Sequence, residues 1–174
     1  MGKLAFLLLF TTFLFAQESK DKTIYLDSLF KEVPKEKMVY TKTIKDYYLE
    51  KTEYKQLLFY KNGNLKLEEK TFGKEIDSPT NGEVIEYYES GNKKSSCWYE
   101  NNIHNGKFIQ WYESGKLKEE GEYIPDNPIF PSYKITNFWK ETGEKTVVDG
   151  NGFYDCESEN GKEKGNYLNG LKDG

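Results

Sequence analysis

The chain has 174 residues, and all 25 of its basic residues are lysines, against 29 Asp and Glu. An acidic chain without arginine is poorly suited to bind a nucleic-acid backbone, which attracts clustered positive charge. Aromatic residues make up 16% of the chain, and alanine occurs only at Ala5 and Ala16. This composition disfavours a helical bundle and favours strands. One histidine and two cysteines leave few candidates for metal ligands or nucleophiles.

Residues 1–16 have the pattern of a secretory signal peptide. A lysine at position 3 precedes the uncharged run Leu4–Phe15, and Ala16 follows it as the expected cleavage position. The run is too short to span the ~30 Å hydrocarbon core as a helix. We therefore expect a secreted, periplasmic or cell-envelope protein with no transmembrane span after cleavage. A retained N-terminal anchor is the alternative.

Residues 17–54 form the expected N-terminal region. Thr23–Val33 and Met38–Ile44 are predicted as a strand pair around the turn Pro34–Lys37, with a helix over Ser28–Met38 as the alternative. Asp46–Lys51 resembles the strand end of the repeat described next, with Lys51 in place of glycine. It is interpreted as a degenerate first hairpin.

A repeat runs through residues 55–174. Strand-like segments end in an aromatic pair, two polar residues and glycine, as in Tyr87–Gly91. These turn glycines are 18 to 28 residues apart: Gly63, Gly91, Gly115, Gly143 and Gly161. The polar-polar-Gly ending predicts a short hairpin loop closed by glycine in the left-handed conformation. Each repeat is thus one β-hairpin that must stack on its neighbours to bury an apolar face.

Two rows of aromatic residues follow from this register. The first members of the pairs are predicted to form a structural aromatic column on one face: Phe59, Tyr87, Trp111 and Trp139. The second members fall on the opposite face and are the candidate interaction strip: Tyr60, Tyr88 and Tyr112. An exposed row of tyrosines with Lys and Glu between them is typical of protein interfaces.

The predicted fold is all-β: an extended antiparallel sheet of repeated β-hairpins, a solenoid preceded by a signal peptide. Gly73–Thr80 and Pro125–Ser132 are interpreted as surface loops. Asp173-Gly174 matches the Asn-Gly pair that opens a repeat at Asn105-Gly106. The last repeat is therefore expected to be incomplete, which suggests either a shortened relative of a longer protein or an edge that accepts a partner's strand.

The remaining chemical candidates are weak. Cys97 and Cys156 lie three hairpins apart in this register, so two free thiols are favoured over a disulfide. His104 is expected in a solvated turn, and the acidic segment from Asp149 lacks the ligand pattern of a calcium loop. Adjacent acids such as Glu119-Glu120 point to opposite faces of a strand and are expected on a solvated surface.

The repeats "NGEVIEYYESGNKKSSCWYENN" and "NGKFIQWYESGKLKEEGEYIP" resemble the bacterial MORN-repeat variant of YwqK-type antitoxins, over about residues 55 to 174. The segments Thr23–Tyr60 and "ITNFWKETGEKTVVDGNG" are also similar to the N-terminal repeat region of TonB-related envelope energy transducers. The resemblance implies a β-hairpin scaffold for protein or membrane contacts. It implies no catalytic residues.

The expected function is that of an exported, non-enzymatic MORN-like scaffold that binds an unknown protein or an envelope component, with no cofactor, metal or nucleic acid. The oligomeric state is open between a monomer and an edge-paired oligomer. One alternative is an antitoxin-like inhibitor of an exported toxin. Another is a carbohydrate-active enzyme, which would need two convergent carboxylates in a cleft.

Overall fold

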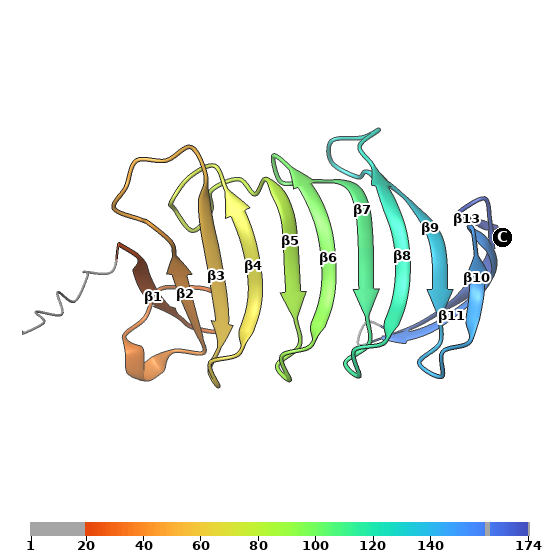
Figure 1. Ribbon diagram of the computed structural model, residues 1–174, viewed down its shortest axis with the longest axis horizontal. Helices are drawn as coiled ribbons and strands as arrows, with labels where there is room; N and C mark the ends of the chain where they lie inside the picture. Colours follow the sequence, from red (N-terminus) through yellow and green to blue (C-terminus); the bar gives the residue numbers. More distant parts are fainter. Residues whose placement is uncertain (1–19, 159–160, 174) are drawn as a thin grey trace, which may run out of the picture.

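The computed structural model describes residues 20–158 and 161–173. They form one antiparallel sheet whose thirteen strands pair in chain order, which confirms the predicted all-β array of sequential hairpins (Figure 1). The strands are β1 (Lys22–Leu26), β2 (Tyr40–Ile44), β3 (Tyr54–Tyr60), β4 (Leu65–Thr71), β5 (Gly82–Tyr87), β6 (Lys93–Glu100), β7 (Ile103–Trp111), β8 (Leu117–Ile124), β9 (Ser132–Trp139), β10 (Lys145–Val148), β11 (Asn151–Ser158), β12 (Gly161–Leu168) and β13 (Leu171–Asp173).

The N-terminal strand pair is present but shorter than predicted. β1 ends at Leu26, and residues 27–33 add only an isolated bridge between Glu32 and Leu26 before β2 pairs with the whole of β1. The alternative helix over residues 28–38 is wrong, because this segment holds only the 3-10 turn η1 (Lys35–Lys37). Residues 46–51 lie in the connection between β2 and β3, so Tyr47 and Tyr48 are turn residues and do not end a strand.

The four complete repeat turns have one geometry. Each turn glycine has a positive φ of 83–95°, and its amide donates to the carbonyl of the second residue of the pair, as Gly115 does to Tyr112 at 2.8 Å. The strand that follows carries one extra residue, because the register shifts by one next to each turn. The predicted left-handed glycines are confirmed at Gly63, Gly91, Gly115 and Gly143. Gly161 also has a positive φ, at the start of β12.

At the strand ends opposite the repeat turns, the connections are either longer loops or two-residue turns. Asn101-Asn102, Asp149-Gly150 and Asn169-Gly170 have positive φ at both residues, as a type I′ hairpin requires. The loops expected over residues 73–80 and 125–132 are found between β4 and β5 and between β8 and β9. The described residues contain no helix that is long and apolar enough to span a membrane. The expected signal peptide, residues 1–16, lies outside the described residues.

Strand alternation gives the sheet two faces of different character. The inner face carries the buried side chains Leu58, Val84, Cys97 and Phe138. One buried cluster lies at the N-terminal end of this face, around Ile24, Leu26 and Leu58. A second lies at the C-terminal end: Ile135, Phe138, Val147, Tyr154 and Cys156. Away from the register shifts, the neighbours of the buried residues in each strand point to the outer face.

The C-terminal hairpins curl back over the inner face (Figure 1). The β12–β13 turn then meets β9, where the amide of Ile135 donates to the carbonyl of Gly170 at 3.0 Å. The amide of Gly170 donates in turn to the carbonyl of Gly150. Asp173 pairs with Asn166 at the end of β13. Two residues separate it from the Asn169-Gly170 turn, as two residues separate Asn105 in β7 from the Asn101-Asn102 turn.

A substitution at Gly150 tests this closure. A Cβ there would lie 2.5 Å from the backbone nitrogen of Gly170, at a φ of +79°. We expect Gly150→Ala to lower the free energy of unfolding by about 3 kcal/mol or more. Gly63→Ala is the matched control, because its φ is +90° but the added Cβ meets nothing within 4 Å. It should cost only the ~1 kcal/mol of left-handed strain. Equal losses in urea denaturation would contradict the closure.

Candidate functional site

Three tyrosines on the inner face tie each hairpin to the next. Their hydroxyls donate across two strands to a backbone carbonyl at 2.7–2.9 Å: Tyr60 to Tyr87, Tyr88 to Trp111 and Tyr112 to Trp139. All three side chains are half-buried. The candidate interaction strip therefore has its hydroxyls engaged within the array.

Beside the first three turns the extra residue is a lysine that covers one of these tyrosine rings. The ammonium nitrogen of Lys66 lies 4.9 Å from the Tyr60 ring centre, Lys94 lies 5.8 Å from Tyr88, and Lys118 lies 5.6 Å from Tyr112. These distances are within the range of cation–π attraction. Each tyrosine is thus fixed by a hydroxyl contact at one end and by a lysine against its ring.

The turns themselves are linked along the edge of the sheet. After the first three turn glycines, the next residue donates a side-chain hydrogen bond to a carbonyl of the following turn: Asn64 to Glu89 and Asn92 to Glu113 at 2.8 Å, and Lys116 to Glu141 at 2.9 Å. Together with the tyrosine bonds, these contacts set the spacing between hairpins. The sequence shows the repeated residues, but their contacts cross from one repeat to the next.

The aromatic column lies on the outer face. Phe59, Tyr87, Trp111 and Trp139 are half-buried, and the register pairs them with Leu65, Lys93, Leu117 and Lys145 respectively. We call these eight residues the outer row. Within the described part of the chain, no two of the four rings are in contact, so the cross-strand stacking expected from the sequence is not present. The rings belong to alternate strands, β3, β5, β7 and β9, which keeps them apart.

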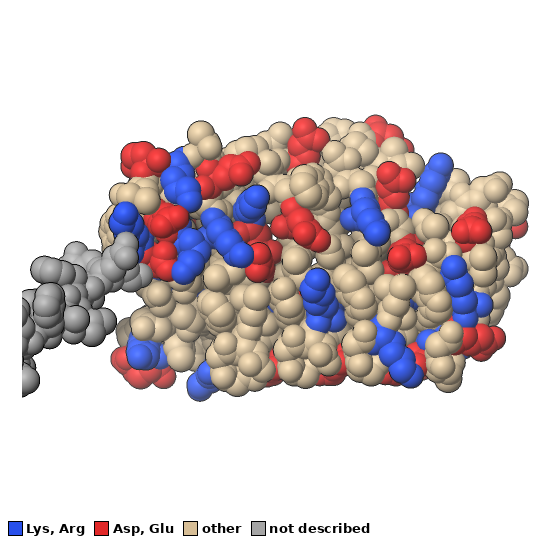
Figure 2. Space-filling model, viewed as in Figure 1, with Lys and Arg blue, Asp and Glu red and all other residues tan. Residues whose placement is uncertain are grey.

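Two residues earlier along β3, β5 and β7 stand Leu57, Ile85 and Ile109, which are also half-buried. On the intervening strands the carboxylates Glu68 and Glu120 lie opposite them. Figure 2 shows the face opposite the curled C-terminal hairpins, with acidic and basic side chains mixed over its upper half and a largely uncharged band below, crossed by a few lysines. Lys145 lies 4.8 Å from the Trp139 ring and Lys93 lies 5.7 Å from the Trp111 ring. The band is therefore aromatic, and two of its four rings have a lysine ammonium group over them.

His104 is not in a solvated turn. The turn consists of Asn101 and Asn102 alone, and His104 lies on β7 with its ring stacked on that of Tyr123 at 4.5 Å. Its Nε2 shares a hydrogen bond with the hydroxyl of Tyr99, and burial lowers the pKa of the imidazole. It borders a hollow of about 210 Å³ on the inner face, lined also by Glu86 and Cys97. This favours a neutral, packed imidazole.

Glu119 is buried, contrary to the solvated surface expected for the Glu119-Glu120 pair. Its carboxylate accepts hydrogen bonds from the hydroxyls of Tyr133 and Tyr154, the latter at 2.9 Å. Burial raises the pKa of this carboxyl group. Gly121 leaves room for the Tyr133 ring, since a Cβ there would lie 2.2 Å from the hydroxyl. The cluster joins β11 to β8 and β9, and only the curling of the chain brings it together.

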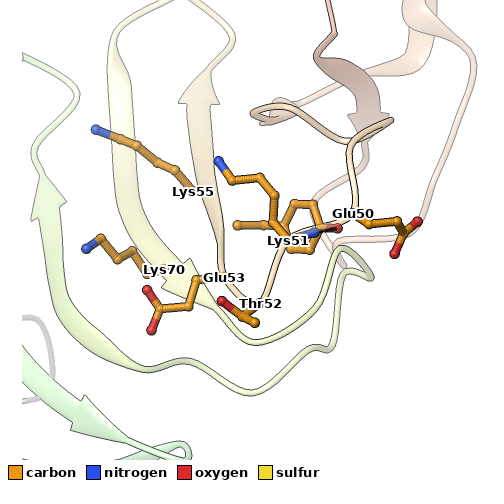
Figure 3. Close-up of a pocket in the computed structure, with 7 residues that line it drawn as sticks. Glu50, Lys51, Thr52, Glu53, Lys55 and Lys70 are labelled. Atoms are coloured by element: carbon orange, nitrogen blue, oxygen red, sulfur yellow. Dashed lines mark hydrogen bonds between the residues drawn. The ribbon is translucent and has the colours of Figure 1, made fainter.

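A hollow of about 590 Å³ lies beside the start of β3 (Figure 3). Lys51, Lys55 and Lys70 extend around it. Lys51 pairs with Asp46 at 2.9 Å and Lys55 pairs with Glu68, so two of the three ammonium groups are already neutralised. The hollow therefore has little net attraction for an anion.

The two cysteines are free and buried, as the repeat register predicts. Burial raises the pKa of the Cys97 thiol to about 11, which makes it a poor nucleophile. In the described ranges, no group of three or more His, Cys, Asp or Glu side chains is arranged to hold a metal ion. The outer row remains as the aromatic feature that recurs in four successive repeats of the described sheet.

No family model, no curated protein and no solved structure matches this chain.

Removing one tyrosine hydroxyl tests the link between hairpins. Tyr112→Phe keeps the ring but removes the donor to the Trp139 carbonyl, so we expect a loss of about 1 kcal/mol in the free energy of unfolding. Tyr48→Phe is the control, because Tyr48 is 69% exposed in a connection. It should change stability by less than ~0.5 kcal/mol. Equal effects in urea titrations would count against the link.

Alkaline pH provides a second test. Burial raises the pKa of both Tyr112 and Tyr167 to about 12, from an ordinary value of 10.0. Because the folded state holds these protons more tightly, their stabilising contribution is complete below pH 10 and is lost as the pH rises to about 12. Unfolding free energy should fall over that range, and Tyr112→Phe should show a shallower fall. A pH-independent stability there would refute this assignment.

Proposed function

We propose that this chain is an exported, non-enzymatic scaffold of MORN-like hairpin repeats, and that the outer row is the surface through which it binds a protein or an envelope component. The observation that carries the proposal is the alignment of four half-buried aromatic side chains on one sheet face, one from each of four repeats. Large aromatic side chains contribute strongly to binding energy at interfaces.

The links between hairpins support the scaffold function. The tyrosine hydroxyls and the turn side chains fix neighbouring hairpins at constant spacing, so the outer row is held in place before a partner arrives. Preorganisation of this kind lowers the entropic cost of binding. The buried Glu119 has a structural partner for each of its oxygens, which supports a role in packing.

The sequence of residues 1–16 supports export, and the repeat sequence supports the MORN-like scaffold. The uncharged run Leu4–Phe15, followed by Ala16, is typical of an exported protein. The Gly-aromatic spacing resembles that of the bacterial MORN-repeat variant. An exported scaffold of this type would meet its partner in the cell envelope or outside the cell.

Capture from a detergent-solubilised envelope fraction tests the proposal. The immobilised protein should retain specific components, and the double variant Tyr87→Ser, Trp111→Ser should lose most of them because two of the four rings are gone. Tyr48→Ser combined with Trp98→Ser is the matched control and should retain them, since both side chains are exposed and lie outside the outer row. Circular dichroism should show that both variants keep the strand spectrum. Equal capture by the outer-row variant would overturn the proposed surface.

A further inference from the structure

The rings of the outer row form a regular array perpendicular to the strands. They belong to β3, β5, β7 and β9, so successive rings are two strands apart, or about 9–10 Å. Leu65, Lys93 and Leu117 stand opposite the rings on the intervening strands. Figure 1 shows β3 to β9 running side by side with little fanning, so the array is close to straight.

This spacing fits one class of polymer. In a fully extended β-1,4-linked hexopyranose chain, every second sugar presents the same face. The length of a two-sugar unit is nearly the distance between successive aromatic rings of the outer row. The C–H bonds on that face are apolar and pack on aromatic rings. We propose that the outer row binds a linear β-1,4-linked glycan of the glucose or N-acetylglucosamine type, with alternate sugars stacked on Phe59, Tyr87, Trp111 and Trp139. This rests on the proposed function, and it specifies the occupant of the same surface.

The side chains around the rings suit this ligand. Lys93 and Lys145 are exposed, and their ammonium groups lie over the Trp111 and Trp139 rings, 5.7 and 4.8 Å from the ring centres. A sugar that stacks on these rings displaces the two flexible lysine side chains, which can then donate to its hydroxyl or acetamido oxygens. No carboxylate belongs to the outer row. A nucleic acid is disfavoured by the net charge of −4, which leaves the glycan as a neutral polymer with a matching repeat.

The proposal predicts a dependence on chain length. We expect the β-1,4-linked hexamers of N-acetylglucosamine or of glucose to shift the tryptophan emission of the full protein, because Trp111 and Trp139 belong to the outer row. The hexamer reaches three rings, the tetramer two and the dimer one, so affinity in calorimetric titrations should rise at each step. Comparing the two sugar types identifies which source the surface prefers. The α-1,4-linked glucose hexamer, whose chain coils, should bind at least about tenfold more weakly.

Variants separate the outer row from other aromatic residues. Trp111→Ala should weaken binding of the preferred hexamer by about tenfold or more, through loss of a central ring. Trp98→Ala is the matched control, because Trp98 is 52% exposed on β6 and is not part of the outer row. It should leave the affinity unchanged.

Three outcomes would overturn the glycan proposal: no binding of either β-1,4 hexamer by the folded protein, equal affinity for dimer and hexamer, or equal losses in the Trp98 and Trp111 variants. If hexamers do not bind while the Tyr87/Trp111 double variant still loses envelope proteins, the glycan is wrong and the proposed contact surface stands. If neither glycan nor protein depends on these rings, both proposals fail.

Discussion

The hydrogen bond from a tyrosine hydroxyl to a backbone carbonyl two strands away is the contact on which the array depends. A meander of hairpins has backbone pairing between all its strands, but pairing alone leaves the sheet free to twist and bend. The bonds from Tyr60, Tyr88 and Tyr112 add a fixed distance between one hairpin and the next. Because the same tyrosines pack under Lys66, Lys94 and Lys118, their side chains are restricted to one orientation.

Because of these bonds, the aromatic residues on the two faces of the sheet have different roles. In three repeats the second aromatic residue of the pair holds hairpins together on the inner face, and the first lies half-buried on the outer face. The sheet then curls at its C-terminal end, so that Tyr154 and Cys156 cover the inner face near Phe138. The outer face keeps its aromatic row, which is the basis of the proposed binding function.

Much of the fold follows from local sequence. Turn glycines with polar neighbours predict the hairpins at Gly63, Gly91, Gly115 and Gly143, because only a residue tolerant of positive φ closes this turn. The alternation of strand residues also places Tyr87 and Trp111 on one face. Which face is buried depends on the long-range curl, which no single repeat encodes. The packing of His104 and of Glu119 was missed for the same reason, since Tyr123 and Tyr154 reach them only in the folded sheet.

Nuclear magnetic resonance of tyrosine hydroxyl protons tests the central claim most directly. In a sample with labelled tyrosine, Tyr60, Tyr88 and Tyr112 should each show a slowly exchanging hydroxyl proton. Each proton should have a cross-relaxation contact to the backbone of the following hairpin, next to the carbonyl of Tyr87, Trp111 or Trp139. Hydroxyl protons that exchange as fast as that of the exposed Tyr48, or contacts confined to their own hairpin, would contradict the account.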